Sequence, residues 1–552
     1  MPITTIPLVS SIAQRALSSS GSGQTKDTRL LACFPDVAIN SVAGEKSAYI
    51  LKRPGETTYS TPAAGESSYG VFISATANII SAFTTSNTTP ATIYLNTTSI
   101  GVLDAGMYPL HFTEAILGGI TYVIFTATTT GTAVMGAWFY ASDAISTSFT
   151  GNRTSGSAIV SSVSSISGLY VGQKITATGF VAGTRIQSID SATQVTMTNA
   201  ASSGAPTNTT FTNERIAKII DSDFPSDIVG PFSELNGRFY IMTDIGRLYG
   251  SELNTPVDWA ASNYVSANRD SDHGAGCARY QEYIVAFGRK SIEFYRDNGN
   301  PSGSVLSFVS SVKGFGALFA SSAFPTYLCS GFNNVFWIDY DDWNLYTFDG
   351  FSPKLLGGWI GSSGINLSAA TLPATMAVHS YLGKRCVYIP SIDNILSNDR
   401  FYYIDTDTWV CPNFSNKTYI SNKESLFLLT DTGTSGKLLQ FAPIPSTFTD
   451  NGAAYTMTIQ TPRYILNQGK GFIVNNVSLL ADNQASGTTT IEMTKDDYGT
   501  WPISYTYDMT TSKKILYRFG RCTDHCAFRL THSANTPWRG THLVVDWEPC
   551  ST

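Results

Sequence analysis

The sequence predicts an all-β protein, and three of its features support that class. Charged residues make up only 14% of the 552 residues, whereas aromatic residues reach 12% and hydrophobic residues 42%. Short runs of alternating or continuous apolar character dominate, and no long segment repeats apolar residues at the spacing of an amphipathic helix. Hairpin patterns recur along the middle of the chain. Because Thr, Tyr, Phe and Val suit a pleated, half-buried surface, we expect strands throughout.

Five hairpin patterns follow one another from the middle of the chain onward. Each is an apolar strand, a tight polar turn and a second strand that carries aromatic residues. Successive patterns start 45, 52, 50 and 40 residues apart, at Asn236, Gln281, Asn333, Gly383 and Lys423. Stretches from Tyr69 and Gly118 have the same shape. Four-stranded propeller blades recur at this period, so the sequence predicts a β-propeller core of about six blades. Two packed β-sandwiches are the alternative.

Changes in composition and in the pattern of apolar residues divide the chain into five segments. Residues 155–213 hold only three charged residues (Lys174, Arg185, Asp190) and strongly alternating Val, Ile and Thr. They resemble a small β-module common in phage and bacterial surface proteins, through Gly168-Leu169-Tyr170-Val171-Gly172, and we expect an insertion into a propeller loop. We assign 1–60 to an N-terminal arm and platform strands, 61–150 to the first propeller strands, 214–450 to the remaining blades, and 451–552 to a C-terminal antiparallel β platform domain.

Charge and hydropathy exclude several classes of protein. The formal net charge is −6, with no cluster of basic residues, so tight nucleic-acid binding is disfavoured and only transient contact with DNA is expected. No apolar run is long enough for a membrane-spanning helix, and the first residues lack the pattern of a signal peptide. The eight scattered cysteines indicate reduced, buried thiols made in a cytoplasm, with a disulfide as the alternative.

Acidic residues are the main candidates for catalysis. They are Asp339, Asp341, Asp342, Asp349, Asp405 and Asp407, and all fall at hairpin turns, where Asp bonds local backbone amides. Asp496, Asp497, Gly499 and Trp501 resemble the Asp-box turn of sialidase-like propellers, which is a structural turn even in enzymes. We therefore interpret both sets as turn formers.

Motifs for metal, cofactor or nucleophile chemistry are missing. The six histidines show no H-E-x-x-H spacing, and Cys522, His525 and Cys526 would need a fourth ligand from elsewhere. No nucleophile elbow, P-loop or dinucleotide fingerprint occurs. The sequence predicts a protein that is not an enzyme, with no catalytic residue, metal site or cofactor.

Three segments together resemble the podovirus tail nozzle family, also called packaged-DNA stabilisation or tail-accessory proteins, which is similar in architecture to tail tubular protein B. The first holds Phe34-Pro35 and then Arg53-Pro54-Gly55; the second is the hairpin series; the third is the C-terminal run that includes Trp538. The chain departs from the family where an asparagine is missing before Phe34 and where Tyr498 replaces a small residue.

The resemblance implies a structural subunit of a virion. It implies a homo-hexamer below a portal-bound adaptor, with the DNA ejection channel on its axis, a tail needle or plug, and tail fibres or spikes on its flank. Assembly would take place in the bacterial cytoplasm. The alternative is a carbohydrate-binding or glycan-degrading propeller, in which Trp337, Trp343 or Trp359 stacks on sugars. A bacterial surface adhesin is a third class, weakened by the missing signal pattern.

Overall fold

The computed structural model describes residues 2–550 apart from 9–28, 40–45, 75, 77, 86–88, 130–134, 146–147, 205–206, 301–302, 320–325, 360–374, 382, 391–399, 412–416, 421–427, 432–434, 442–446, 451, 469, 497 and 513–514. Every regular element in these residues is a strand. The predicted all-β class is confirmed.

Seven antiparallel units of four strands each share one plan, in which neighbours in the sheet follow one another along the chain, with two exceptions described below. We call these units blades 1 to 7. Blade 1 is β6(Ser67–Ile73), β7(Ile79–Thr84), β8(Thr92–Leu95) and β9(Thr98–Val102); blade 2 is β10(Met107–Leu117), β11(Ile120–Thr129), β12(Met135–Ala141) and β18(Thr209–Lys218); blade 3 is β19(Ile228–Leu235), β20(Arg238–Thr243), β21(Arg247–Ser251) and β22(Trp259–Ser266); blade 4 is β23(Gly274–Tyr280), β24(Tyr283–Gly288), β25(Ser291–Asp297) and β26(Leu306–Lys313). Blade 5 is β27(Leu328–Gly331), β28(Asn334–Ile338), β29(Asn344–Asp349) and β30(Ser352–Trp359); blade 6 is β31(Ala377–Tyr381), β32(Lys384–Ile389), β33(Arg400–Tyr403) and β34(Thr408–Val410); blade 7 is β35(Lys417–Ile420), β36(Leu428–Asp431), β37(Leu438–Phe441) and β5(Glu56–Ser60).

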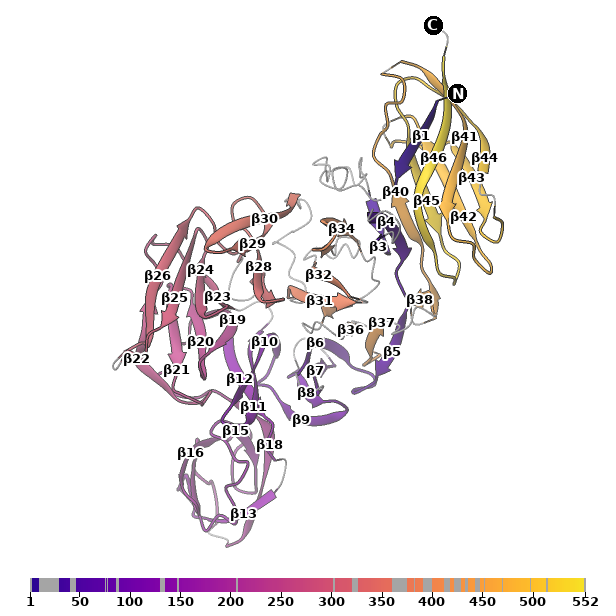
Figure 1. Ribbon diagram of the computed structural model, residues 1–552. Helices are drawn as coiled ribbons and strands as arrows, with labels where there is room; N and C mark the ends of the chain where they lie inside the picture. The colour runs from indigo at the N-terminus through magenta and orange to yellow at the C-terminus, as the bar shows by residue number, and fades with distance from the viewer. Residues whose placement is uncertain are drawn as a thin grey trace.

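The blades form a ring around one axis (Figure 1). First strands contact each other in turn, from β6 to β10, β19, β23, β27 and β31, and β35 contacts β6 again. The last blade is completed by β5, which comes from the start of the chain and pairs with β37, as in Leu439 opposite Thr58. The predicted propeller core is confirmed. The sequence predicted about six blades, and the described residues form seven.

Turn chemistry explains why the sequence patterns identified the blades. In blades 2, 3 and 5 the first two strands are joined by two consecutive residues with positive φ: Gly118-Gly119, Asn236-Gly237 and Phe332-Asn333. Such type I′ turns match the twist of paired strands, and they favour Gly and Asn. Each of the seven hairpin patterns lies in a different blade.

The inserted module lies between β12 and β18 of blade 2. Its strands are β13(Ser148–Arg153), β14(Ile159–Ser161), β15(Gln173–Thr176), β16(Ile186–Ser191) and β17(Gln194–Met197), around a core that includes Phe149, Val160 and Phe211. Strand β18 serves both parts: Thr209–Thr212 pair with β13, and Ile216–Lys218 pair with β12. The module therefore begins before the predicted residue 155, because β13 needs β18 as its partner.

Both ends of the chain build one β-sandwich, which we call the terminal sandwich. One sheet has the order β3(Cys33–Ile39), β4(Lys46–Lys52), β46(Arg539–Pro549), β41(Phe472–Ala481) and β44(Ile515–Cys522), and β1(Ile3–Pro7) also pairs with β46. The other has the order β2(Arg29–Leu31), β40(Met457–Gln460), β45(Ala527–His532), β42(Thr488–Thr494) and β43(Ile503–Asp508). The short strands β38(Thr449–Asp450) and β39(Ala453–Ala454) lie on the return path from the propeller. The predicted N-terminal boundary at residue 60 is too late, because β5 belongs to blade 7.

Candidate functional site

The terminal sandwich and the propeller share one hydrophobic core. The ring of Phe34, on β3, lies 5.8 Å from the rings of both Tyr403 in blade 6 and Phe441 in blade 7. Asp36 of the same strand pairs with Lys384 of blade 6 at 3.0 Å. Pro35 sits between them, in register with Ile50 of β4. Apolar burial therefore holds the two domains together along β3.

Arg53 ties together the two segments that link the domains. Its Nη1 and Nη2 donate to Asp450 Oδ1 and Oδ2 at 2.8 and 2.5 Å, and both side chains are buried. Arg53 leaves the sandwich after β4, whereas Asp450 lies on β38 on the return path. The Arg53 guanidinium also lies 4.0 Å from the ring centre of Tyr455, whose hydroxyl donates to the Arg53 carbonyl. A bidentate pair of this kind fixes orientation as well as distance.

Gly55 allows the two linking segments to touch. A Cβ at this position would lie 2.2 Å from the carbonyl oxygen of Thr449. Its N–H donates to the carbonyl of Thr447 at 2.6 Å. Any larger residue after Pro54 would push the outgoing and returning chains apart.

Trp538 closes the junction from the C-terminal side. Its side chain is buried, and its Nε1 donates to Thr489 Oγ1 at 2.9 Å. Its carbonyl accepts from the N–H of Lys52 at 2.9 Å, and the Lys52 ammonium donates to the carbonyl of Ala534 at 2.6 Å. Burial, with the nearby charge of Arg53, lowers the pKa of Lys52 to about 8. The six family-motif positions thus lie along one junction, although the sequence separates the first from the last by about 500 residues.

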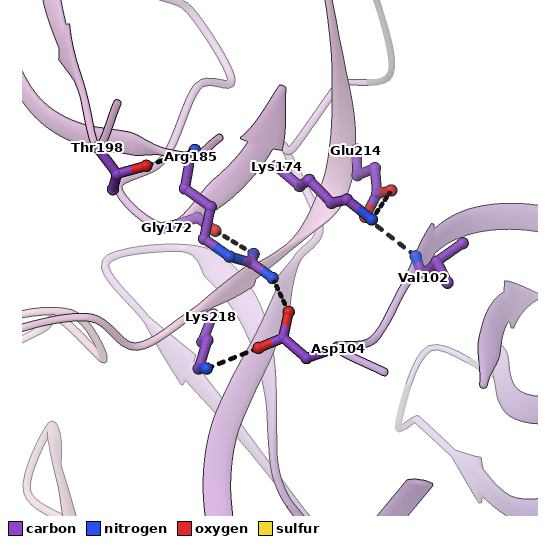
Figure 2. Close-up of polar contacts among 8 residues, drawn as sticks. All are labelled: Val102, Asp104, Gly172, Lys174, Arg185, Thr198, Glu214 and Lys218. Carbon is purple, nitrogen blue, oxygen red and sulfur yellow. Dashed lines mark hydrogen bonds and ion pairs between the residues drawn. The ribbon is translucent and has the colours of Figure 1, made fainter. Parts of the chain in front are cut away.

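A second polar cluster fastens the inserted module to the propeller (Figure 2). Asp104, in the connection between blades 1 and 2, accepts from Arg185 Nη2 at 2.7 Å and from Lys218 Nζ at 2.6 Å. Arg185 belongs to the module and also donates to the carbonyl of Gly172 at 2.8 Å. Burial alone would raise the pKa of Asp104, but the hydrogen bonds and charges of Lys218 and Arg185 outweigh it and lower the pKa. One carboxylate therefore joins both blades to the module.

Glu214 and Tyr170 extend this attachment. Glu214 of β18 accepts from the N–H of Val102 in blade 1 at 3.0 Å and lies 3.6 Å from Lys174 Nζ. The Tyr170 ring packs edge-on to those of Tyr122 and Phe139 of blade 2. The sequence singled out Lys174 and Arg185 as two of three charges in the module. It gave no signal for Asp104 or Glu214, because their role depends on how close the module lies to the propeller in the folded chain.

The acidic residues of the propeller act in turns. Asp339 is buried and accepts from the N–H groups of Gly316, Asp341 and Asp342 at 2.9, 3.0 and 3.3 Å. Asp405 pairs with Arg385 at 2.6 Å, Asp407 has a φ of 48° in its own turn, and Asp349 ends β29. These contacts support the turn interpretation.

The Asp-box-like segment is the turn between β42 and β43 of the terminal sandwich. Asp496 Oδ1 accepts from Thr494 Oγ1 at 2.7 Å and from the Thr500 N–H at 2.9 Å, and the Gly499 N–H donates to the Asp496 carbonyl at 3.2 Å. Bonds from Thr500 and Thr494 lower the pKa of Asp496 to about 2. Trp501 stacks with the Arg529 guanidinium at 4.4 Å. Asp497 lies outside the described residues.

The other candidates of the sequence do not assemble into a site, although the thiols of Cys522 and Cys526 share a hydrogen bond. Within the described ranges, no three His, Cys, Asp or Glu side chains are grouped so that they could hold a metal ion. All eight cysteines are free thiols. Trp337 is fully buried in the propeller core, which rules out sugar stacking by this residue, and Trp343 is half-buried with a φ of 59°. None of the described residues belongs to a helix able to cross a bilayer.

Comparison with known proteins gives no family. No family model and no curated protein matches the chain. Among solved structures it is similar to the computationally designed Ika8 protein, with a TM-score of 0.33 and 10% identity over 69% of this chain and 98% of that one. BamB from Moraxella catarrhalis gives 0.32 and 10% over 71% and 100%, and a chain of the Mitotic Checkpoint Complex gives 0.31 and 7% over 68% and 89%. Similarities this low carry no argument about function.

Proposed function

We propose that this protein is a structural subunit of a short-tailed phage tail, the nozzle. Six copies would form a ring below the portal-bound adaptor, retain the packaged double-stranded DNA and line its ejection channel. The observation that carries the proposal is the junction: Phe34, Pro35, Arg53, Pro54, Gly55 and Trp538, the positions that resemble the nozzle family, all contribute to one joint between propeller and sandwich. Five of these positions lie on or directly after the paired strands β3 and β4, and Trp538 meets Lys52 from the other end of the chain.

The construction of the joint supports a mechanical role. A shared hydrophobic core, a buried bidentate ion pair and a close backbone crossing hold the two domains in one relative orientation. A second attachment at Asp104 does the same for the module. A conduit under load needs such stiffness, because its subunits must keep ring-closing contacts in register.

In the assembled tail, the terminal sandwich would face the adaptor and the propeller would lie outward, with the module projecting from it. Both chain ends lie on the sandwich, on the side away from the propeller (Figure 1). Tail fibres or spikes would dock on the flank, and a needle or plug would close the channel. DNA would touch the ring only transiently, in keeping with the net charge of −6.

Cryo-electron microscopy of the full chain with its neighbouring tail proteins tests the proposal. The expected result is a sixfold ring on the tail axis with the sandwiches nearest the adaptor. An isolated monomer with a substrate-filled cleft would contradict it. So would cleavage of a polysaccharide by the purified chain that is lost on Asp342→Asn or Asp405→Asn, and that outcome would favour the glycan-degrading alternative.

A further inference from the structure

The outer face of the larger sandwich sheet carries apolar side chains where solvent-facing strands are normally polar. Strands β1, β46, β41 and β44 lie side by side in this sheet (Figure 1). Ile6, Leu543, Val545, Val477 and Leu479 point into the core. The alternate positions therefore point outward. They include Asp546 and Asn476, which are hydrogen-bonded to each other at 2.9 Å, and a set that we call the distal face: Ile3, Thr5, Pro7, His542, Val544, Ser478, Leu480 and Ile515.

The pairing of the strands places the apolar side chains of the distal face next to one another. Thr5, Val544, Ser478 and Ile515 form one row across the four strands, and Pro7, His542 and Leu480 form the next. Leu480 is thus diagonal to both Val544 and Ile515, within reach of side-chain contact. Ile3, Leu480 and Ile515 are 68%, 47% and 37% exposed. Grouped apolar exposure of this kind marks interaction surfaces, whereas scattered exposure does not.

Two arginines border the distal face on its β44 side. Arg518 and Arg521 are exposed, and in the part of the chain that the structure describes neither has a carboxylate partner. Other exposed arginines do: Arg279 with Glu234, Arg296 with Glu282 and Arg385 with Asp405, at 2.9, 3.1 and 2.6 Å. The segment 509–523 holds two more basic residues and no acidic one. The charge of Arg518 and Arg521 is therefore available to a carboxylate on another molecule.

Protection of the sheet edge explains only part of this arrangement. Charged residues and a backbone irregularity, here the φ of 69° at Arg518, keep edge strands from pairing with other chains. Pro2 and Pro7 do the same at the two ends of β1. These features leave strand addition disfavoured along β1 and β44. They give no reason for Leu480, Val544 and Ile515 to be apolar on the face itself.

We propose that the distal face is a docking surface for a partner protein whose contacting surface is apolar at its centre and carries carboxylates opposite Arg518 and Arg521. This inference rests on the proposed function, in which that partner is the adaptor ring. The apolar centre supplies burial, and the arginines at the rim steer the encounter and select an acidic partner. Burial lowers the pKa of His542, which pairs with Leu480 on the face.

Hydroxyl-radical footprinting of the full chain, alone and in tails purified from virions that contain it, tests the surface. Labelling of Leu480, Val544 and Ile515 is expected to fall sharply on assembly. Leu253, which is 56% exposed on blade 3, serves as an internal reference that keeps its labelling. Binding of the purified chain to the isolated adaptor ring gives the second measurement. Leu480→Asp is expected to weaken it about tenfold or more, since an unpaired charge enters the centre of the contact. Leu253→Asp is its matched control.

The outcomes separate this inference from the proposed function. If the tail contains a ring of this chain but Leu480 stays labelled, the docking surface is wrong and the nozzle assignment stands. If Leu480 becomes protected in a ring of this chain alone, a second copy covers the face and the adaptor does not. If binding to the adaptor is equally weak for Leu253→Asp, the effect is not local to the face. If no tail contains the chain, both proposals fail.

Discussion

Arg53 and Asp450 are 397 residues apart in sequence, yet they form a buried, two-bonded ion pair across the joint between propeller and sandwich. The pair holds the outgoing and the returning segment of the chain against each other. Tyr455 covers the guanidinium, and the buried Glu56 carboxylate lies 3.8 Å from Nη1, but both hydrogen bonds that fix the orientation go to Asp450.

Removal of one partner of this pair should loosen the joint. Arg53→Met leaves the Asp450 carboxylate buried without its cation, which costs about 3–5 kcal/mol in comparable sites. Native-state hydrogen exchange should speed up first at β5, β38 and β4. Arg296→Met is the control, because its pair with Glu282 is more than half exposed on both sides and should contribute under about 1 kcal/mol. Equal effects of the two changes would contradict a role for Arg53 in the joint.

Two glycines of the module, with the same backbone conformation, provide a matched test of close packing. Gly172 has a φ of 86°, and a Cβ there would lie 1.8 Å from the carbonyl oxygen of Lys218; Gly183 has a φ of 87° and open space around it. Gly172→Ala should displace the module from β18 and lower the yield of folded protein. Gly183→Ala should cost only the backbone strain, about 1 kcal/mol. Circular dichroism melts and limited proteolysis distinguish the two.

Asp104 should make the attachment of the module depend on pH. Its folded pKa is lowered, so its stabilisation is fully present above the ordinary value of 3.8 and is lost as the pH falls through the folded pKa. Asp104→Asn should mimic the acid state at pH 7 and raise hydrogen exchange at residues 98–104 and 170–186. Asp190→Asn, which loses a carboxylate bonded only within the module, should leave those segments unchanged. Exchange that stays slow after Asp104→Asn would refute the attachment.

The stability of the protein should fall even on a substitution of Trp538 that keeps most of the volume of its side chain. Trp538→Phe removes the hydrogen bond to Thr489 and opens a cavity, and we expect a loss of about 2–3 kcal/mol. Trp501→Phe, at a half-buried position, should cost well under half of that. Calorimetric unfolding of the full chain measures both, and a similar drop for the two would argue against Trp538 as part of the joint.

Much of the architecture was predictable from local residue preferences. Turn residues such as Asn236-Gly237 and the aromatic second strands marked each blade, because type I′ turns and pleated surfaces select residue types over a few neighbouring positions. The turn at Asp496 was predictable for the same reason, because its hydrogen bonds join residues within a seven-residue segment.

The sequence by itself determined that this protein is all-β, that its blades repeat and that a module interrupts them. Only the tertiary structure decided that β5 closes the seventh blade, that β18 is shared with the module, and that Asp104 and Asp450 are the partners of Arg185 and Arg53. The physical reason is the separation along the chain over which each kind of interaction acts. Strand and turn preferences act between neighbours along the chain, whereas edge pairing and buried ion pairs depend on which distant segments the folded core brings together.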